Sequence, residues 1–113
     1  MECFVYLSCM IGIEVDIICI ADNSQPGWVK CVFKDIHDKE WTIIEKLPVV
    51  SDEYLSKKSQ FPLKGFVAGS IVSERYDANN NKIVLFSTEM PWDINAETGE
   101  AQFEVFADQI IVT

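Results

Sequence analysis

The sequence has a single histidine, His37, and no pair of cysteines at the CxxC spacing that is typical of zinc sites. Its four cysteines, at positions 3, 9, 19 and 31, are widely spaced. This spacing predicts reduced thiols, with no disulfide, no bound metal and no cofactor. A phosphate-binding glycine loop and a serine nucleophile motif are both missing from the sequence. Acid–base chemistry through an imidazole would therefore have to use His37.

Basic residues are scarce. Lys and Arg total 9 against 18 Asp and Glu, which gives a formal net charge of -9. A surface of this sign repels nucleic-acid phosphates and anionic lipid headgroups, so neither is an expected partner. It attracts basic surfaces and speeds their approach. The charge therefore favours a protein partner with a basic surface.

A long apolar run is also missing. Residues 3–20 are mostly apolar, but Gly12, Glu14 and Asp16 interrupt them and no basic residue precedes them. This pattern predicts neither a signal peptide nor a membrane helix, and a cytoplasmic location follows by elimination. Met10 is a second candidate start, which would make residues 1–9 a dispensable extension.

The sequence is rich instead in strand patterns and turn signals. Two strand-like runs, residues 26–35 with a Pro-Gly turn signal at 26–27 and residues 40–46, flank the polar turn 36–39 and predict a β-hairpin. Two more, residues 66–76 and 82–88, flank the turn 77–81. Further strands are expected at 13–20, 94–96, 101–106 and 109–112. We expect an all-β fold over 1–113: one small antiparallel β-barrel of six or more strands, or a sandwich, with at most one short helix near 52–57.

Alternation within these strands predicts which side chains form the core. Gly69 interrupts the arm 66–76, which indicates a bulge or a close crossing of strands at that point. The predicted core comprises Val15, Ile17, Val29, Cys31, Phe33, Ile43, Val67, Ile71, Leu85, Phe103 and Val105.

The string Asp77-Ala78-Asn79-Asn80-Asn81 is similar to the opening of a calcium-binding loop. Lys82 stands where that loop needs glycine, and Thr88 stands where it needs a bidentate glutamate. Asn and Asp tolerate left-handed backbone angles, so a hairpin turn explains the string better than calcium does.

Seven residues are candidates for binding a partner. Glu14 and Asp16 share one strand face, and three tryptophans lie near strand ends, where large amphipathic rings serve interfaces. Core packing of the rings and a solvated acidic face are the alternatives. The full set is Trp28, Trp41, Trp92, Glu14, Asp16, Asp35 and Asp38.

The string PGWVKCVFKDIHDKEWTIIEKLPVV, with FPLKGFVAGSIVSERYD and MPWDI, resembles a group of short bacterial proteins without an assigned function. The likeness covers about residues 13–108 and brings no catalytic motif. The expected architecture is also similar to the β-barrel domains of translation elongation factors. The resemblance implies a bacterial origin and a compact β-domain, and fold analogy alone assigns no function.

These observations predict a non-enzymatic, acidic protein-binding module. One concrete form is an immunity-type inhibitor that covers the basic active site of a toxin. The alternative is a small enzyme or small-molecule-binding barrel with carboxylates at its mouth. A polar pocket around Glu14, Asp16 or His37 would favour the alternative, and a flat acidic and aromatic patch would favour the binding module.

Overall fold

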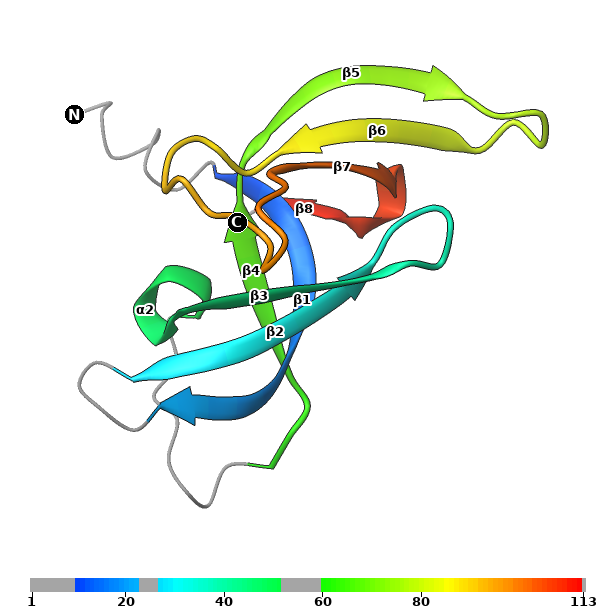
Figure 1. Ribbon diagram of the computed structural model, residues 1–113. Coiled ribbons are helices and arrows are strands. Elements are labelled where there is room, and N and C mark those ends of the chain that lie inside the picture. The colour runs from blue at the N-terminus through cyan, green and yellow to red at the C-terminus, as the bar shows by residue number, and fades with distance from the viewer. Residues whose placement is uncertain (1–9, 23–26, 52–59, 113) are drawn as a thin grey trace.

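The computed structural model describes residues 10–22, 27–51 and 60–112. Nearly all of its regular structure is antiparallel β-sheet (Figure 1). In chain order the elements are β1 Ile11–Asp22, β2 Trp28–Lys34, β3 Glu40–Lys46, α2 Leu47–Val50, β4 Leu63–Ala68, β5 Ser70–Tyr76, β6 Lys82–Ser87, β7 Gln102–Phe106, the 3-10 turn η1 Ala107–Gln109 and β8 Ile110–Val112. Among described residues, no helix is both long and apolar enough to cross a membrane.

The first sheet is built around the long strand β1. Its order is β3-β2-β1-β4, and β8 also pairs with the start of β1. In this hairpin β2 lies within the predicted run 26–35 and β3 has the predicted bounds 40–46. The register is regular from Trp28 opposite Lys46 to Lys34 opposite Glu40. The predicted hairpin is therefore confirmed.

The second sheet has the order β5-β6-β7. The predicted turn at 77–81 joins β5 to β6, and Asn80 has a left-handed φ of 65°. The predicted strand at 94–96 is wrong. Its residues form a loop that buries Ile94 and Ala96 while Ala96 N–H donates to Glu100 O at 2.8 Å. Their side chains are apolar because they pack, although their backbone pairs with no strand.

Gly69 stands where the chain passes from the first sheet to the second. Its N–H donates to Ile11 O at 3.1 Å, β4 before it pairs with β1, and β5 after it pairs with β6. A Cβ atom at this position would collide with the carbonyl oxygen of Ser87 and the ring of Phe86. The expected close crossing is confirmed, and it divides the predicted arm 66–76 into two strands in different sheets.

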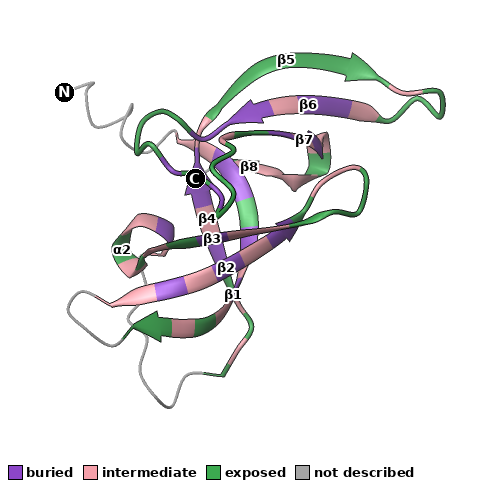
Figure 2. Cartoon of the chain, in the orientation of Figure 1, coloured by how far each residue is buried: buried purple, intermediate pink, exposed green. Residues whose placement is uncertain are grey.

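Both sheets contribute to one cluster of buried side chains, which Figure 2 shows in purple on β1, β4 and β6. Nine of the eleven predicted core residues are buried there: Val15, Ile17, Val29, Cys31, Phe33, Ile43, Val67, Phe103 and Val105. A single turn of helix, α2, follows β3 directly and adds Val50 to this core. The helix predicted near 52–57 lies outside the described residues.

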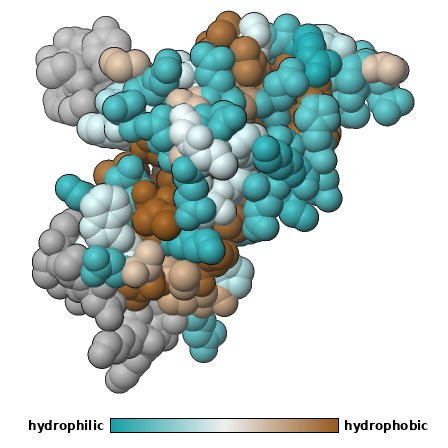
Figure 3. Space-filling model, viewed as in Figure 1, coloured by the Kyte–Doolittle hydropathy of each residue, from teal (hydrophilic) through white to brown (hydrophobic). Residues whose placement is uncertain are grey.

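Two core predictions are wrong. Ile71 is 40% exposed because β5 packs neither of its faces into the core: all of its residues are exposed. Figure 3 shows hydrophobic atoms over β5 at the top of the view. Leu85 is only half-buried because the core takes its neighbours Val84 and Phe86. The strand β6 is apolar on both faces, so alternation does not indicate which of its faces points into the core.

The described strands form two open sheets, and their pairings do not close into a ring. A mostly β, antiparallel fold is confirmed, but the closed barrel is not.

Candidate functional site

The candidate site lies on the outer face of β1. Side chains alternate along this strand, so Ile13, Val15 and Ile17 are buried at 0–2% exposure while Glu14 and Asp16 point away from the core. Alternation therefore places both carboxylates on one face, as the sequence predicted.

Strand β4 supplies a lysine to these carboxylates. The antiparallel register sets Asp16 opposite Lys64, and the Lys64 Nζ lies 2.9 Å from Asp16 Oδ1 and 3.9 Å from Glu14 Oε1. The hydrogen bond and charge of Asp16, followed by the charge of Glu14, raise the pKa of Lys64 above its usual value. One ammonium group thus serves two carboxylates.

A cleft of about 520 Å³ opens beside this cluster. It lies between the middle of β1, the end of β2, the start of β3, the start of β4 and η1. Its lining residues are Glu14, Val15, Asp16, Val32, Phe33, Lys34, Glu40, Lys64, Asp108 and Gln109.

The wall formed by η1 is fixed in place by Gln109. Its Nε2 donates to Lys34 O at 2.8 Å, and its Oε1 accepts the N–H of Phe106 at 2.9 Å. These two bonds tie the turn after β7 to the end of β2, across 75 residues of sequence. The cleft is therefore held open by the fold.

The cleft carries more negative than positive charge. Four of its described lining residues are carboxylates and two are lysines. The Nζ of one lysine, Lys34, lies 3.5 Å from a carboxylate outside the cleft, that of Asp38. Within the part of the chain that the structure describes, Glu40 and Asp108 have neither a hydrogen bond nor an ion pair from their side chains. Uncompensated carboxylates around a concave surface concentrate the field there and attract cations.

A metal ion does not fit this arrangement well. The described residues contain no group of three His, Cys, Asp or Glu side chains placed to hold one. An ammonium or guanidinium group needs only acceptor oxygens at hydrogen-bond distance, which the cleft offers from several directions.

Trp41 and Asp35 are bound to each other. The Trp41 Nε1 donates to Asp35 Oδ2 at 2.9 Å, the indole packs against Phe103 with ring centroids 5.0 Å apart, and the Lys39 Nζ lies 4.1 Å from its centroid. Partial burial raises the pKa of Asp35, but hydrogen bonds from Trp41 and from the amides of Lys39 and His37 outweigh it and leave that pKa below its usual value. Both residues therefore hold the β2–β3 turn.

Asp38 and Trp28 lie at opposite ends of the same hairpin. Asp38 is an exposed turn residue with a left-handed φ of 63°. Trp28 begins β2, is half-buried, and has the Lys46 Nζ 5.6 Å from its ring centroid. Neither residue lines the cleft.

Trp92 lies in the loop between β6 and β7 and is 53% exposed. The fold therefore separates the three tryptophans, and of the seven predicted binding residues it brings only Glu14 and Asp16 together in the cleft. A partner-binding role for the other five stays a prediction.

His37 and Cys31 are also apart. Cys31 is fully buried, while His37 is exposed in the turn with its Nε2 3.9 Å from Glu104 Oε1. No catalytic pair of these residues is formed.

Sequence reasoning missed five polar residues of the cleft: Lys34, Glu40, Lys64, Asp108 and Gln109. Lys64 reaches Asp16 through a pairing between strands 48 residues apart. Local patterns carry no signal for such a register, because alternation fixes a residue's face but not its neighbour in the next strand.

Comparison with known proteins returned no matching family model, curated protein or solved structure. The resemblance to short bacterial proteins therefore stays a prediction.

Proposed function

We propose that this protein is a non-enzymatic module that binds a protein partner with a basic surface, and that the cleft receives a lysine or arginine side chain of that partner. The single observation behind this proposal is the cleft's charge: four carboxylates, two of them without a partner among the described residues, against two lysines. A guanidinium or ammonium group would complete the pairing.

The charge of the whole chain supports the same proposal. A net charge of -9 creates a field that draws a basic protein in from beyond contact distance. Salt screens that field over about 8–10 Å at physiological ionic strength, so salt should slow association more than it speeds dissociation. An immunity-type inhibitor of a bacterial toxin, acting in the cytoplasm, is the concrete form we favour.

We also propose that the scaffold is barrel-like. Two backbone hydrogen bonds support this: Ile36 N–H donates to Glu104 O at 3.1 Å, and Glu97 N–H donates to Thr42 O at 2.9 Å. They join the β2–β3 hairpin to β7 and to the loop before it. The outer strand β3 of the first sheet, and the turn before it, are therefore hydrogen-bonded to the second sheet's strand β7 and to the loop before β7.

One observation favours a second candidate, a site for a small cationic molecule. The cleft volume of about 520 Å³ lies within the range of roughly 300–1,000 Å³ that is typical of small-molecule pockets. This candidate corresponds to the alternative that the sequence left open.

A calorimetric titration with an oligolysine peptide tests the cleft. Glu40→Gln combined with Asp108→Asn removes two charges inside it, and Glu45→Gln combined with Glu74→Gln removes two charges outside it. We expect the cleft variant to weaken binding by about tenfold or more and the control by less than about threefold, because only paired, partly desolvated charges contribute strongly.

Equal losses in the two variants would mean that binding follows net charge alone, and the cleft would then have no special role. Spermidine, titrated in the same way, separates the two candidates. A small-molecule site should bind spermidine at least as tightly as the peptide. The immunity form further predicts that the gene directly follows that of a large secreted toxin.

A further inference from the structure

We propose that the loop of residues 88–101, between β6 and β7, is a second contact surface, and that it inserts into an apolar pocket with a basic rim on a protein partner. This inference rests on the proposed function because it takes the partner to be a protein. It does not depend on the cleft, because no residue of the loop lines it.

The base of the loop is firmly closed. Thr88 N–H donates to Ala101 O at 2.8 Å, and the Thr88 hydroxyl donates to Ile94 O at 2.6 Å. Ile94 N–H returns a bond to Thr88 O at 3.0 Å, and both residues are fully buried. Asp93 N–H also donates to Glu89 O at 2.8 Å, which closes residues 89–93 into a tight turn. The tip of the loop is therefore fixed on the core.

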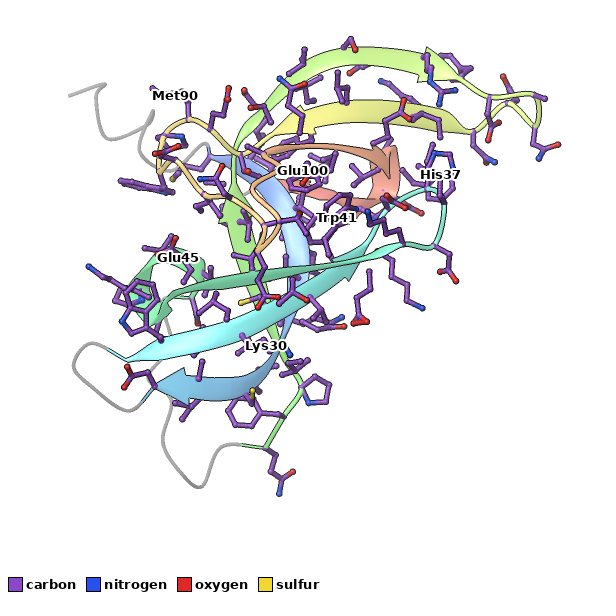
Figure 4. All side chains as sticks on the ribbon, in the orientation of Figure 1. Lys30, His37, Trp41, Glu45, Met90 and Glu100 are labelled. Atoms are coloured by element: carbon purple, nitrogen blue, oxygen red, sulfur yellow. The ribbon has the colours of Figure 1, made fainter. Side chains whose placement is uncertain are left out.

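This fixed tip exposes its two largest apolar side chains. Met90 is 69% exposed and Trp92 is 53% exposed, although Ile94 two residues later is fully buried. Figure 4 labels Met90 on this loop, at the end of the molecule away from the β2–β3 turn that carries His37. Aromatic rings and methionine are enriched at the centres of protein interfaces, where their burial supplies much of the affinity.

Acidic residues surround the tip. Glu89 and Asp93 flank Met90 and Trp92 directly, Glu97 and Glu100 follow in the same loop, and all four are exposed. No lysine or arginine occurs between residues 88 and 101. An apolar tip within a wholly acidic frame is complementary to an apolar pocket within a basic rim.

The same charges argue against a membrane. Exposed Trp and Met side chains also insert into bilayers, but anionic headgroups would repel the four carboxylates around them. A protein is the better match, and the closed base of the loop lowers the conformational entropy lost when the tip is bound.

A phage-displayed library of random peptides, selected on the immobilised native protein, provides the probe. We expect enriched peptides to combine aromatic or long aliphatic residues with Lys or Arg. For the most enriched peptide, Trp92→Ala should weaken the affinity by roughly 30-fold, as expected for an anchor at the centre of an interface. Tyr76→Ala, which removes a ring that is 62% exposed outside the loop, should change it by less than about twofold.

Three results would overturn the proposal: no enriched peptide, enriched peptides without basic residues, or equal effects of Trp92→Ala and Tyr76→Ala. Binding of vesicles of phosphatidylcholine and phosphatidylserine that is lost in Trp92→Ala would reassign the loop to membranes.

The cleft variant Glu40→Gln with Asp108→Asn separates this inference from the proposed function. If the peptide occupies the loop, its affinity should stay within about twofold of the native value in that variant. If the cleft variant loses the peptide while Trp92→Ala keeps it, the loop has no role and the cleft retains its role. All variants should first show native melting curves, since none removes a buried side chain.

Discussion

Asp35 and Asp77 occupy the same position in the two hairpin turns of this protein. In each turn the Oδ1 accepts the amides of the residues two and four positions later, at 2.8–3.0 Å. The residue three positions later is left-handed in both, with φ of 63° at Asp38 and 65° at Asn80. One local device, an aspartate that caps its own turn, therefore closes both hairpins.

The two turns differ in what else the aspartate binds. Among the described residues, the Asp77 side chain accepts one further bond, from the exposed Asn81 side chain, at 3.2 Å. Asp35 accepts the Trp41 indole, and Trp41 packs on the core residue Phe103. Only Asp35 couples its turn to the core.

The stability of the protein should fall in acid partly through Asp35. Its folded pKa lies below the usual value, so the ionised carboxylate stabilises the fold at pH above about 4, and this contribution is lost as the pH falls through the folded pKa. Asp35→Asn should lower the free energy of unfolding at neutral pH by about 1 kcal/mol, because neutral acceptors form weaker bonds. The substitution should also make the free energy of unfolding depend less steeply on pH in acid.

Urea denaturation at several pH values measures both effects. Asp108→Asn is the matched control, since that carboxylate has no bond or ion pair with any described residue. An equally steep loss of stability in acid for Asp35→Asn and the native protein would contradict the prediction.

Truncation of Trp41 should lower the stability of the fold far more than truncation of Trp92. Trp41→Ala removes a ring packed on the core and leaves Asp35 without its indole donor, so we expect a loss of about 3 kcal/mol in the free energy of unfolding. Trp92→Ala should change it by less than about 0.5 kcal/mol, because the ring is largely exposed. Chemical denaturation of the two variants under the same conditions measures both losses. A larger loss of stability for Trp92→Ala than for Trp41→Ala would contradict the prediction.

Gly99 should be intolerant of a side chain for backbone reasons alone. Its φ is 98°, and a Cβ there would meet nothing within 4 Å. Gly99→Ala should therefore lower the free energy of unfolding by about 1–2 kcal/mol through left-handed strain, without any steric clash. Asn95→Ala, at an exposed position of the same loop, should have little effect. Equal melting temperatures for the two variants would show that the turn relaxes at no cost.

Cys19 and Cys31 should differ sharply in reactivity. Burial, followed by the charges of Glu45 and Cys19, raises the pKa of Cys31 to about 12, while Cys19 is exposed. Iodoacetamide should alkylate Cys19 in the native protein and reach Cys31 only after unfolding, because the thiolate is the nucleophile. Peptide mapping by mass spectrometry gives the answer residue by residue, and rapid native labelling of Cys31 would show that this part of the core opens readily.

The hairpins could be predicted because their information is local. A polar turn between two alternating arms fixes both strands and their pairing. The structure places β2 within the predicted run 26–35 and β3 at the predicted residues 40–46. Leu85 could not be assigned correctly because β6 is apolar on both faces. Ile71 was misplaced because alternation does not reveal that both faces of β5 are exposed.

Only part of the candidate site could be predicted from the sequence. Alternation set Glu14 and Asp16 together on one face, but the other walls of the cleft come from the β1–β4 register and from η1. Both depend on contacts between distant segments, which a single sequence does not encode locally.

The crossing at Gly69 makes the two sheets inseparable along the chain. A cut in the turn after Asp77 would leave one fragment with β1 to β4 of the first sheet and β5 of the second, and another with β6, β7 and β8. Neither fragment would contain a complete sheet, so each would need the other to cover its apolar surface. We expect the halves to gain structure only when they meet, which would suit this small scaffold to use as a split reporter.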